Sequence, residues 1–267
     1  MLNILLMPIL AFGHLAFQII DGTVLFLRHL ARMAELTART VVRIPLVFKN
    51  VNLTVQQAFT IGVESLPLVV VTSIFVGGEG VLQANFQFNG LVPLKYLGFA
   101  VSKSLVAELC PVLVSFVVAS RVSTAIAAEI ASMKNSEQLD AMRCLDLDAI
   151  RYLIMPRFIA SVVMLPILVI FSELIAYMSS VLVAILATKV TLSLYITGLK
   201  LFFEPRDMLI GILKTSVFGA VISITGSYFG FEAQKGASGV GESTTRAVMI
   251  SCVLILVFDF LIAFLVN

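Results

Sequence analysis

The chain has 267 residues, of which 60% are apolar and 13% are charged, and its mean hydropathy is +1.06. These values exclude a water-soluble globular protein and leave room for about five or six membrane helices of ~20 residues each. The formal net charge of +2 is too small to indicate nucleic-acid binding, so we expect no nucleic acid among its partners. No repeat, low-complexity tract or flexible linker divides the chain, which predicts a single integral membrane domain over residues 1–267.

An N-terminal interfacial region is predicted over residues 1–50. Residues 1–27 form an apolar run with polar interruptions, which fits a signal h-region, a poor span or an interfacial helix. No convincing cleavage site follows the run, so we expect it to be retained. Next come four arginines that share one narrow stripe of a helical wheel, namely Arg28, Arg32, Arg39 and Arg43. Their helix is expected to lie along the membrane surface, with the arginine stems in the acyl region and the guanidinium groups at the lipid headgroups, until Pro45 ends it.

The transmembrane core, residues 55–267, contains five stretches that are apolar and long enough to cross ~30 Å of hydrocarbon. They are Val55–Val76, Leu97–Ala131, Pro156–Ala187, Met208–Phe229 and Ala247–Val266. As a helix the third would be ~48 Å long, which is too long for one upright span and too short for two. We expect one tilted helix there, with Pro166 as the place for a bend.

The distribution of basic residues favours one orientation of these spans. One side carries Arg28, Arg32, Arg39, Arg43, Lys49, Lys134, Arg143, Arg151, Arg157, Lys235 and Arg246. The other side carries only Lys95, Lys189, Lys200 and Arg206. The positive-inside rule therefore places the loop Ser136–Arg157 in the cytoplasm and Asn267 in the periplasm.

The cytoplasmic loop, SEQLDAMRCLDLDAIRYLIMPR, alternates acidic, basic and apolar residues. On a helical wheel one face is apolar, and it carries Leu139, Met142, Leu145 and Ala149. This pattern predicts a short amphipathic helix, after which Asp148 caps a new helix that begins at Ala149. The pattern fits a helix that docks a partner, or a loop whose charges merely keep it out of the bilayer.

Two segments resemble the signatures of the MlaE/YrbE permease family. The first is ELCPVLVSFVVASRVSTAIAAEIASMKNSEQLDAMRCLDLDAIRYLIMPR, Glu108–Arg157, and the second is SGVGESTTRAVMISCVLILVFDF, Ser238–Phe260. Members of this family are membrane subunits of ABC transporters that move phospholipids and related lipids. The resemblance implies a non-catalytic, multi-pass permease of the inner membrane. It also implies a homodimer, a cytoplasmic ABC ATPase and a periplasmic Mce-domain protein as partners.

The resemblance further implies that the cytoplasmic helix couples the permease to its ATPase. The residues carried over as the ATPase contact are Glu137, Gln138, Asp140 and Arg143. Where the family usually has Gly and Pro in this loop, the chain has Asp146 and Ala149. Aspartate tolerates a left-handed backbone better than most residues, so we expect docking to survive.

Polar residues at membrane depth predict a lipid path, because a charge in hydrocarbon costs ~2.5–3.5 kcal/mol on insertion scales unless it is paired or hydrated. A helical wheel places several of them on or beside one face. The residues assigned to the path are Ser104, Glu108, Ser115, Arg121 and Glu129. Pro111 adds a backbone carbonyl without its helical partner near Glu108. The alternative is a hydrogen-bonded seam between helices or subunits, in which Arg121 pairs with an acid.

Other chemistries lack the residues they need. The segment GASGVGES, Gly236–Ser243, is nearly a phosphate loop, but Glu242 stands where a lysine must contact the phosphates, so we expect ATP hydrolysis in a separate subunit. The only histidines, His14 and His29, lie in the N-terminal amphipathic region, so we expect no positioned base for a serine nucleophile, and no ligand cluster predicts a metal or cofactor. An ion-coupled secondary transporter or channel that uses the same buried acids remains the alternative function.

Overall fold

The computed structural model describes residues 24, 27–45, 51–88, 93, 96–188, 190–200 and 204–266. These residues contain helices and connections but no strand. Five helical segments are long and apolar enough to cross a membrane, which confirms the predicted number. They are Val51–Phe88, Leu97–Asn135, Ile150–Ala187, Pro205–Glu232 and Ala237–Val266. Each is longer than predicted, because hydropathy marks only the apolar part while the backbone hydrogen bonds continue into the polar ends.

The first three spanning segments are assembled from shorter elements. The first contains α2 (Val51–Gly62), η2 (Val63–Ser65) and α3 (Leu66–Phe88). The second contains α4 (Leu97–Ser104), the π-helical segment η4 (Leu105–Leu109) and α5 (Cys110–Asn135), and the third contains the π-helical η5 (Ile150–Ile154) and α7 (Met155–Ala187). The breaks fall beside Pro67, Pro111 and Pro156, whose rings have no N–H for the helical ladder. The predicted single long helix is confirmed, because α7 runs for 33 residues with Pro166 inside it.

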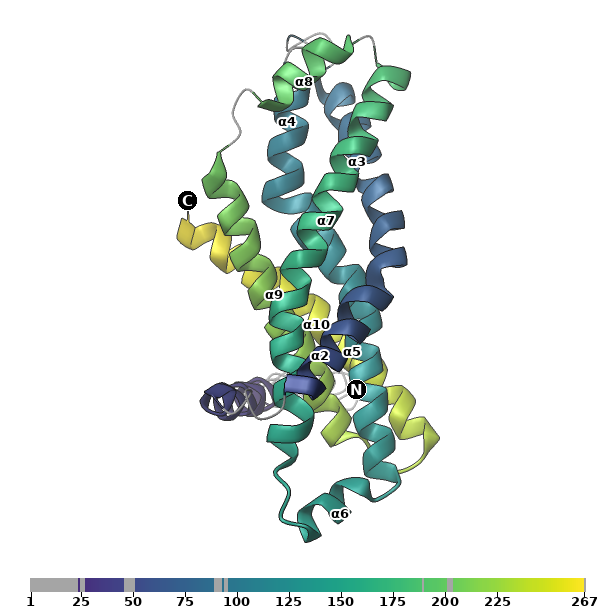
Figure 1. The fold of residues 1–267 in the computed structure, drawn as a ribbon, viewed down its shortest axis with the longest axis vertical. Coiled ribbons are helices and arrows are strands. Elements are labelled where there is room, and N and C mark those ends of the chain that lie inside the picture. The colour runs from purple at the N-terminus through teal and green to yellow at the C-terminus, as the bar shows by residue number, and fades with distance from the viewer. Residues whose placement is uncertain are drawn as a thin grey trace, which may run out of the picture.

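The remaining elements complete a long bundle with two distinct ends (Figure 1). They are α6 (Gln138–Cys144), α8 (Leu192–Lys200), α9 (Pro205–Glu232) and α10 (Ala237–Val266). Figure 1 shows α6 at one end of the bundle and α8 at the other. The distribution of basic residues predicts that the α6 end faces the cytoplasm. The segment GASGVGES lies in the first turns of α10 and the residue before it, so it is helical rather than a phosphate loop.

Close helix packing in the core depends on small residues. A Cβ atom on Gly77 of α3 would lie 2.1 Å from the carbonyl oxygen of Ala176 in α7, and one on Gly219 of α9 would lie 2.4 Å from that of Ser161. The same α3–α7 contact holds a hydrogen bond of 2.8 Å between Ser73 and Ser172. Small and hydroxyl residues are what membrane helices use to pack closely, since lipid removes most of the hydrophobic drive between them.

The N-terminal helix, residues 27–42, lies across the long axis of the bundle near the α6 end (purple in Figure 1). Met33 and Thr40 are buried against the bundle, whereas Leu27 and Val42 are exposed. The prediction of a surface helix that ends near Pro45 agrees with this placement. The side of the helix that faces the bundle packs against protein, because Met33 lies in a cluster with residues of α7, α9 and α10. Residues 1–23 lie outside the described residues, so their predicted retention and placement stay untested.

Candidate functional site

The predicted cytoplasmic helix is present as α6, and its two ends are fixed by left-handed residues. Glu137 has φ 60° and Asp146 has φ 56°. After α6 the amide of Asp146 donates to Arg143 O at 3.1 Å, and the amide of Leu147 donates to Met142 O at 2.9 Å. These two bonds form a Schellman motif with Asp146 at the position that usually holds glycine. The expectation that aspartate adopts this conformation in place of glycine is confirmed.

The predicted apolar face of α6 is only partly correct. Leu139 is 5% exposed and packs in the main core, but Leu145 is 70% exposed. The Schellman turn explains the difference, because it ends the helix at Cys144 before the wheel reaches Leu145. The charged face is exposed, with an ion pair of 3.2 Å between Asp140 and Arg143.

The return from α6 to the membrane is anchored by Asp148. Its carboxylate accepts a hydrogen bond of 3.0 Å from the amide of Ile150, which confirms the predicted cap. The other carboxylate oxygen accepts a bond of 2.6 Å from Nε of Arg43 in the N-terminal region. One arginine of the predicted stripe thus links the N-terminal helix to the loop that presents α6.

The predicted lipid-path residues do not form one continuous face. Ser104 and Glu108 are exposed, whereas Ser115 is completely buried and its hydroxyl has no hydrogen-bond partner among the described residues. The π-helical segment η4 follows Ser104, contains Glu108 and precedes Ser115, and it closes i→i+5 bonds in place of i→i+4 bonds. Each extra residue rotates the following helix by about 100°, so a uniform wheel misplaced Ser115.

Arg121 and Glu129 serve as ties between helices. Arg121 donates to Glu64 at 2.5 Å and to the hydroxyl of Ser65 at 2.7 Å, which joins α5 to the break between α2 and α3. Glu129 pairs with the buried Arg157 at 2.7 Å and joins α5 to α7. For these two residues the structure favours the hydrogen-bonded seam that was the alternative to the lipid path.

Glu108 belongs to a charged cavity that sequence analysis described only in part. The cavity has a volume of about 210 Å³ and lies between η4, α9 and the end of α10. Its lining includes Lys103, Glu108, Asp207 and Lys214, together with Ala263 and Val266 of α10. Lys103 pairs with Asp207 at 2.5 Å. The irregular backbone expected near Pro111 is present here as η4.

A buried ion pair closes the inner side of this cavity. Nζ of Lys214 lies 2.8 Å from Asp259, and the two side chains are 3% and 14% exposed. Lys214 also donates to Ala107 O at 3.4 Å, the carbonyl four residues before Pro111. That carbonyl lacks an amide donor because proline has no N–H. Sequence analysis did not identify Lys214 as a site residue; Pro111 was the signal that marks where a donor was needed.

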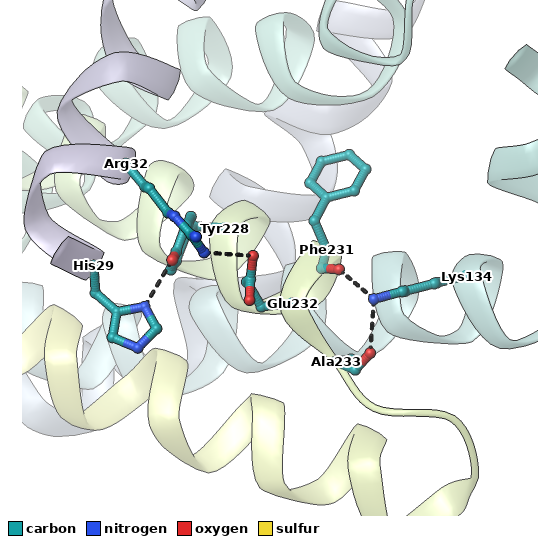
Figure 2. A network of polar contacts seen from close by, with 7 residues as sticks. All are labelled: His29, Arg32, Lys134, Tyr228, Phe231, Glu232 and Ala233. Atoms are coloured by element: carbon teal, nitrogen blue, oxygen red, sulfur yellow. Dashed lines mark hydrogen bonds and ion pairs between the residues drawn. The ribbon is translucent and has the colours of Figure 1, made fainter. Parts of the chain in front are cut away.

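At the α6 end of the bundle, the last turn of α9 is held by polar side chains from two other elements (Figure 2). His29 Nδ1 and the hydroxyl of Tyr228 are 2.7 Å apart, and Arg32 lies 3.5 Å from Glu232. From the opposite side, Lys134 of α5 donates to the carbonyl oxygens of Phe231 at 2.6 Å and Ala233 at 2.8 Å. Within the described residues no cluster of His, Cys, Asp or Glu side chains could hold a metal ion.

Comparison with known proteins matches the sequence of this chain to a family of permeases. The family model described as Permease MlaE matches residues 54–265. A probable ABC transporter permease of Rickettsia prowazekii (strain Madrid E) is 40% identical over 211 residues, which cover 79% of this chain and 82% of the relative. A probable ABC transporter permease of Synechocystis sp. (strain ATCC 27184 / PCC 6803 / Kazusa) is 35% identical over 79% of this chain and 81% of its own length. Protein TRIGALACTOSYLDIACYLGLYCEROL 1, chloroplastic, of Arabidopsis thaliana is 37% identical over 79% of this chain and 60% of its own length.

Proposed function

The chain belongs to the MlaE permease family and is a lipid-transport permease of the ABC type. We propose that α6 couples this permease to a separate ATPase. We also propose that the cavity beside Glu108 receives the lipid headgroup. It is a multi-pass transport subunit rather than an enzyme. The position of α6 carries the proposal, because a short charged helix stands at the cytoplasmic end between two spans (Figure 1).

The proposed ATPase contact is the exposed surface of α6 and the residue before it, formed by Glu137, Gln138, Asp140 and Arg143. Asp140 and Arg143 expose 67% and 77% of their side chains, and no tertiary contact within the described residues neutralises them. The helix is nevertheless held in place, because Leu139 is buried and Asp148 binds Arg43. Because α6 is held firmly and its charges are exposed, it suits electrostatic docking of an ATPase whose movements must be transmitted to the permease.

The proposed headgroup site is the cavity beside Glu108. Charged side chains within a membrane span normally face protein or water, and they mark transport pathways. Here Lys103, Glu108 and Asp207 surround an open volume at the edge of apolar helices. A phospholipid likewise combines a charged headgroup with apolar chains. The charged cavity rim therefore fits the headgroup, and the apolar flanking spans fit the chains.

We further propose that two copies of the chain assemble through α10. Only 11% of the apolar stretch of α10 is buried within one chain, compared with 33–56% for the other spans. Phe260 and Phe264 stack on each other on this exposed surface. Because Ala263 and Val266 line the cavity beside Glu108, pairing through α10 would bring two such cavities to the dimer seam. We place this dimer in the inner membrane, with an Mce-domain partner at the periplasmic end near α8.

Lipid transfer by the reconstituted permease and its ATPase tests the headgroup site. Glu108→Gln keeps the shape and hydrogen bonding, whereas Glu108→Leu removes both charge and polarity. We expect a graded loss, about tenfold to a hundredfold for the leucine variant, since a hydrogen bond to a charged group contributes about 1.5–3 kcal/mol. Dimer recovery and basal ATPase activity should be preserved, and Glu79→Leu, which changes an exposed acid of α3 outside this cavity, serves as the control.

Two outcomes would contradict this assignment. Normal transfer by an intact Glu108→Leu dimer would exclude the cavity as the headgroup site. Loss of the dimer would instead assign Glu108 to a structural seam.

The buried Lys214–Asp259 pair favours a second function, an ion-coupled transporter, because such carriers place charged pairs at membrane depth. Lipid transfer driven by a proton gradient without ATP would support that function against the first.

A further inference from the structure

A second cavity lies at the cytoplasmic end, between the N-terminal helix, α6, the start of the third span and the last turn of α9. Its volume of about 570 Å³ falls within the range of small-molecule sites. Two carboxylates line it, and the cationic side chains outnumber them. The cations are Arg32, Arg39, Lys134, Arg143 and Lys235. The cavity therefore carries an excess of positive charge.

The contacts of these cations compensate their charge only in part. Arg39 pairs with Glu35 at 2.5 Å, but more than half of each side chain is exposed, and exposed pairs are weak. Lys134 binds two backbone carbonyls at the end of α9, and a helix C-terminus supplies only about half of a negative charge. Arg32 approaches Glu232 only to 3.5 Å, and Lys235 approaches Glu137 only to 3.8 Å. Figure 2 shows Arg32 and Lys134 reaching the last turn of α9 from opposite sides.

The cavity also has an apolar part, formed by side chains that include Leu36, Ile150, Ile154 and Phe231. Its basic rim includes Arg32 and Arg39, which belong to the helix expected at the level of the lipid headgroups. A ligand that fits must therefore combine an anionic group with apolar chains and must reach the site from the membrane surface.

We propose that this cavity binds the phosphate headgroup of an anionic glycerophospholipid from the cytoplasmic leaflet. The phosphate would contact Arg39 on the N-terminal helix and Lys134 on α5. It would also compete with Asp140 for Arg143, whose ion pair is exposed and 3.2 Å long. A bound lipid thereby ties the N-terminal helix to α6 and makes the position of α6 depend on the charge of the membrane. This role is separate from the cargo site beside Glu108 and does not require that the cargo be anionic.

Native mass spectrometry of the full chain tests the proposal. The chain is reconstituted in phosphatidylcholine with a minor fraction of phosphatidylglycerol, extracted, and analysed for retained phosphatidylglycerol. Arg39→Gln and Lys134→Gln should each lower retention about fivefold, the effect expected for one basic charge near an anionic membrane. Arg28→Gln is the matched control, because it removes the same charge from the same helix but lies outside the cavity lining. It should leave retention unchanged.

Four comparisons distinguish lipid binding in the cavity from structural support, free-anion binding and protein docking. Lys134→Arg should restore retention if charge matters, whereas continued loss would assign Lys134 to support of the α9 end. Inorganic phosphate should fail to displace the lipid; displacement would mean that the cavity recognises free phosphate. If Arg28→Gln lowered phosphatidylglycerol retention equally, the effect would come from the general surface charge rather than from the cavity. Loss of ATPase recovery with unchanged lipid retention would assign the cavity to the protein partner, and the proposal would fall.

Discussion

Removal of the Lys214 ammonium should destabilise the fold strongly, because its partner would remain buried. In Lys214→Met the apolar stem is kept, but Asp259 loses a partner at 2.8 Å and Ala107 loses the donor to its carbonyl. Lys214 is 3% exposed and Asp259 is 14% exposed, so water cannot replace the lost contacts fully. Breaking a buried pair by removing one partner costs about 3–5 kcal/mol.

The lower end of that range applies here, since the Asp259 side chain retains 14% exposure. We therefore expect the free energy of unfolding to fall by about 3 kcal/mol in Lys214→Met. The double variant Lys214→Met/Asp259→Leu removes both charges, so its free energy of unfolding should be only about 1 kcal/mol below that of the wild type. Asp259→Leu alone leaves the Lys214 ammonium buried without its partner and should cost about as much as Lys214→Met, so the coupling energy between the two positions should be about 5 kcal/mol.

Equilibrium unfolding of the full chain in mixed detergent micelles would measure these differences. Lys103 and Asp207 form a matched control pair in the same cavity, but Lys103 is 43% exposed. Lys103→Met should therefore cost less than about 1 kcal/mol, as exposed ion pairs do. The reasoning would be refuted if Lys214→Met stayed within about 1 kcal/mol of the wild type. It would also be refuted if the double variant lost as much stability as the two single variants together.

Three further outcomes follow from the packing, the charges and the topology. Gly77→Ala should cost about 1–3 kcal/mol, since its Cβ would meet α7 at 2.1 Å, whereas Gly241→Ala, with nothing within 4 Å, should leave the unfolding midpoint unchanged. Exchange of the α6 charges by Asp140→Arg with Arg143→Asp keeps their mutual attraction but reverses the surface, so pull-down should lose the ATPase while the permease stays folded; undiminished recovery would exclude that surface. A cysteine at Ser136, in a variant without native cysteines, should resist an impermeant thiol reagent added from outside, and labelling would reject the proposed orientation.

Local features of the sequence were sufficient to predict the membrane spans and the turn and cap after α6. Hydropathy predicted five crossings, because the cost of exposing polar backbone in lipid leaves helices as the available structure for such stretches. The cap at Asp148 and the left-handed turn at Asp146 were predictable for a similar reason. Each depends on hydrogen bonds to residues only a few positions away.

Only the tertiary structure decided which polar side chains meet. The wheel that joined Ser104, Glu108 and Ser115 assumed a uniform helix, and one π-helical segment separated them. The partner of Lys214 lies 45 positions along the chain, on α10, so no local pattern could identify it. An α-helix fixes its own hydrogen bonds from neighbouring residues, but the register between helices depends on packing contacts such as Gly77 against Ala176. For this chain the sequence therefore determined the spans and the short helix α6, and helix packing determined the charged cavities.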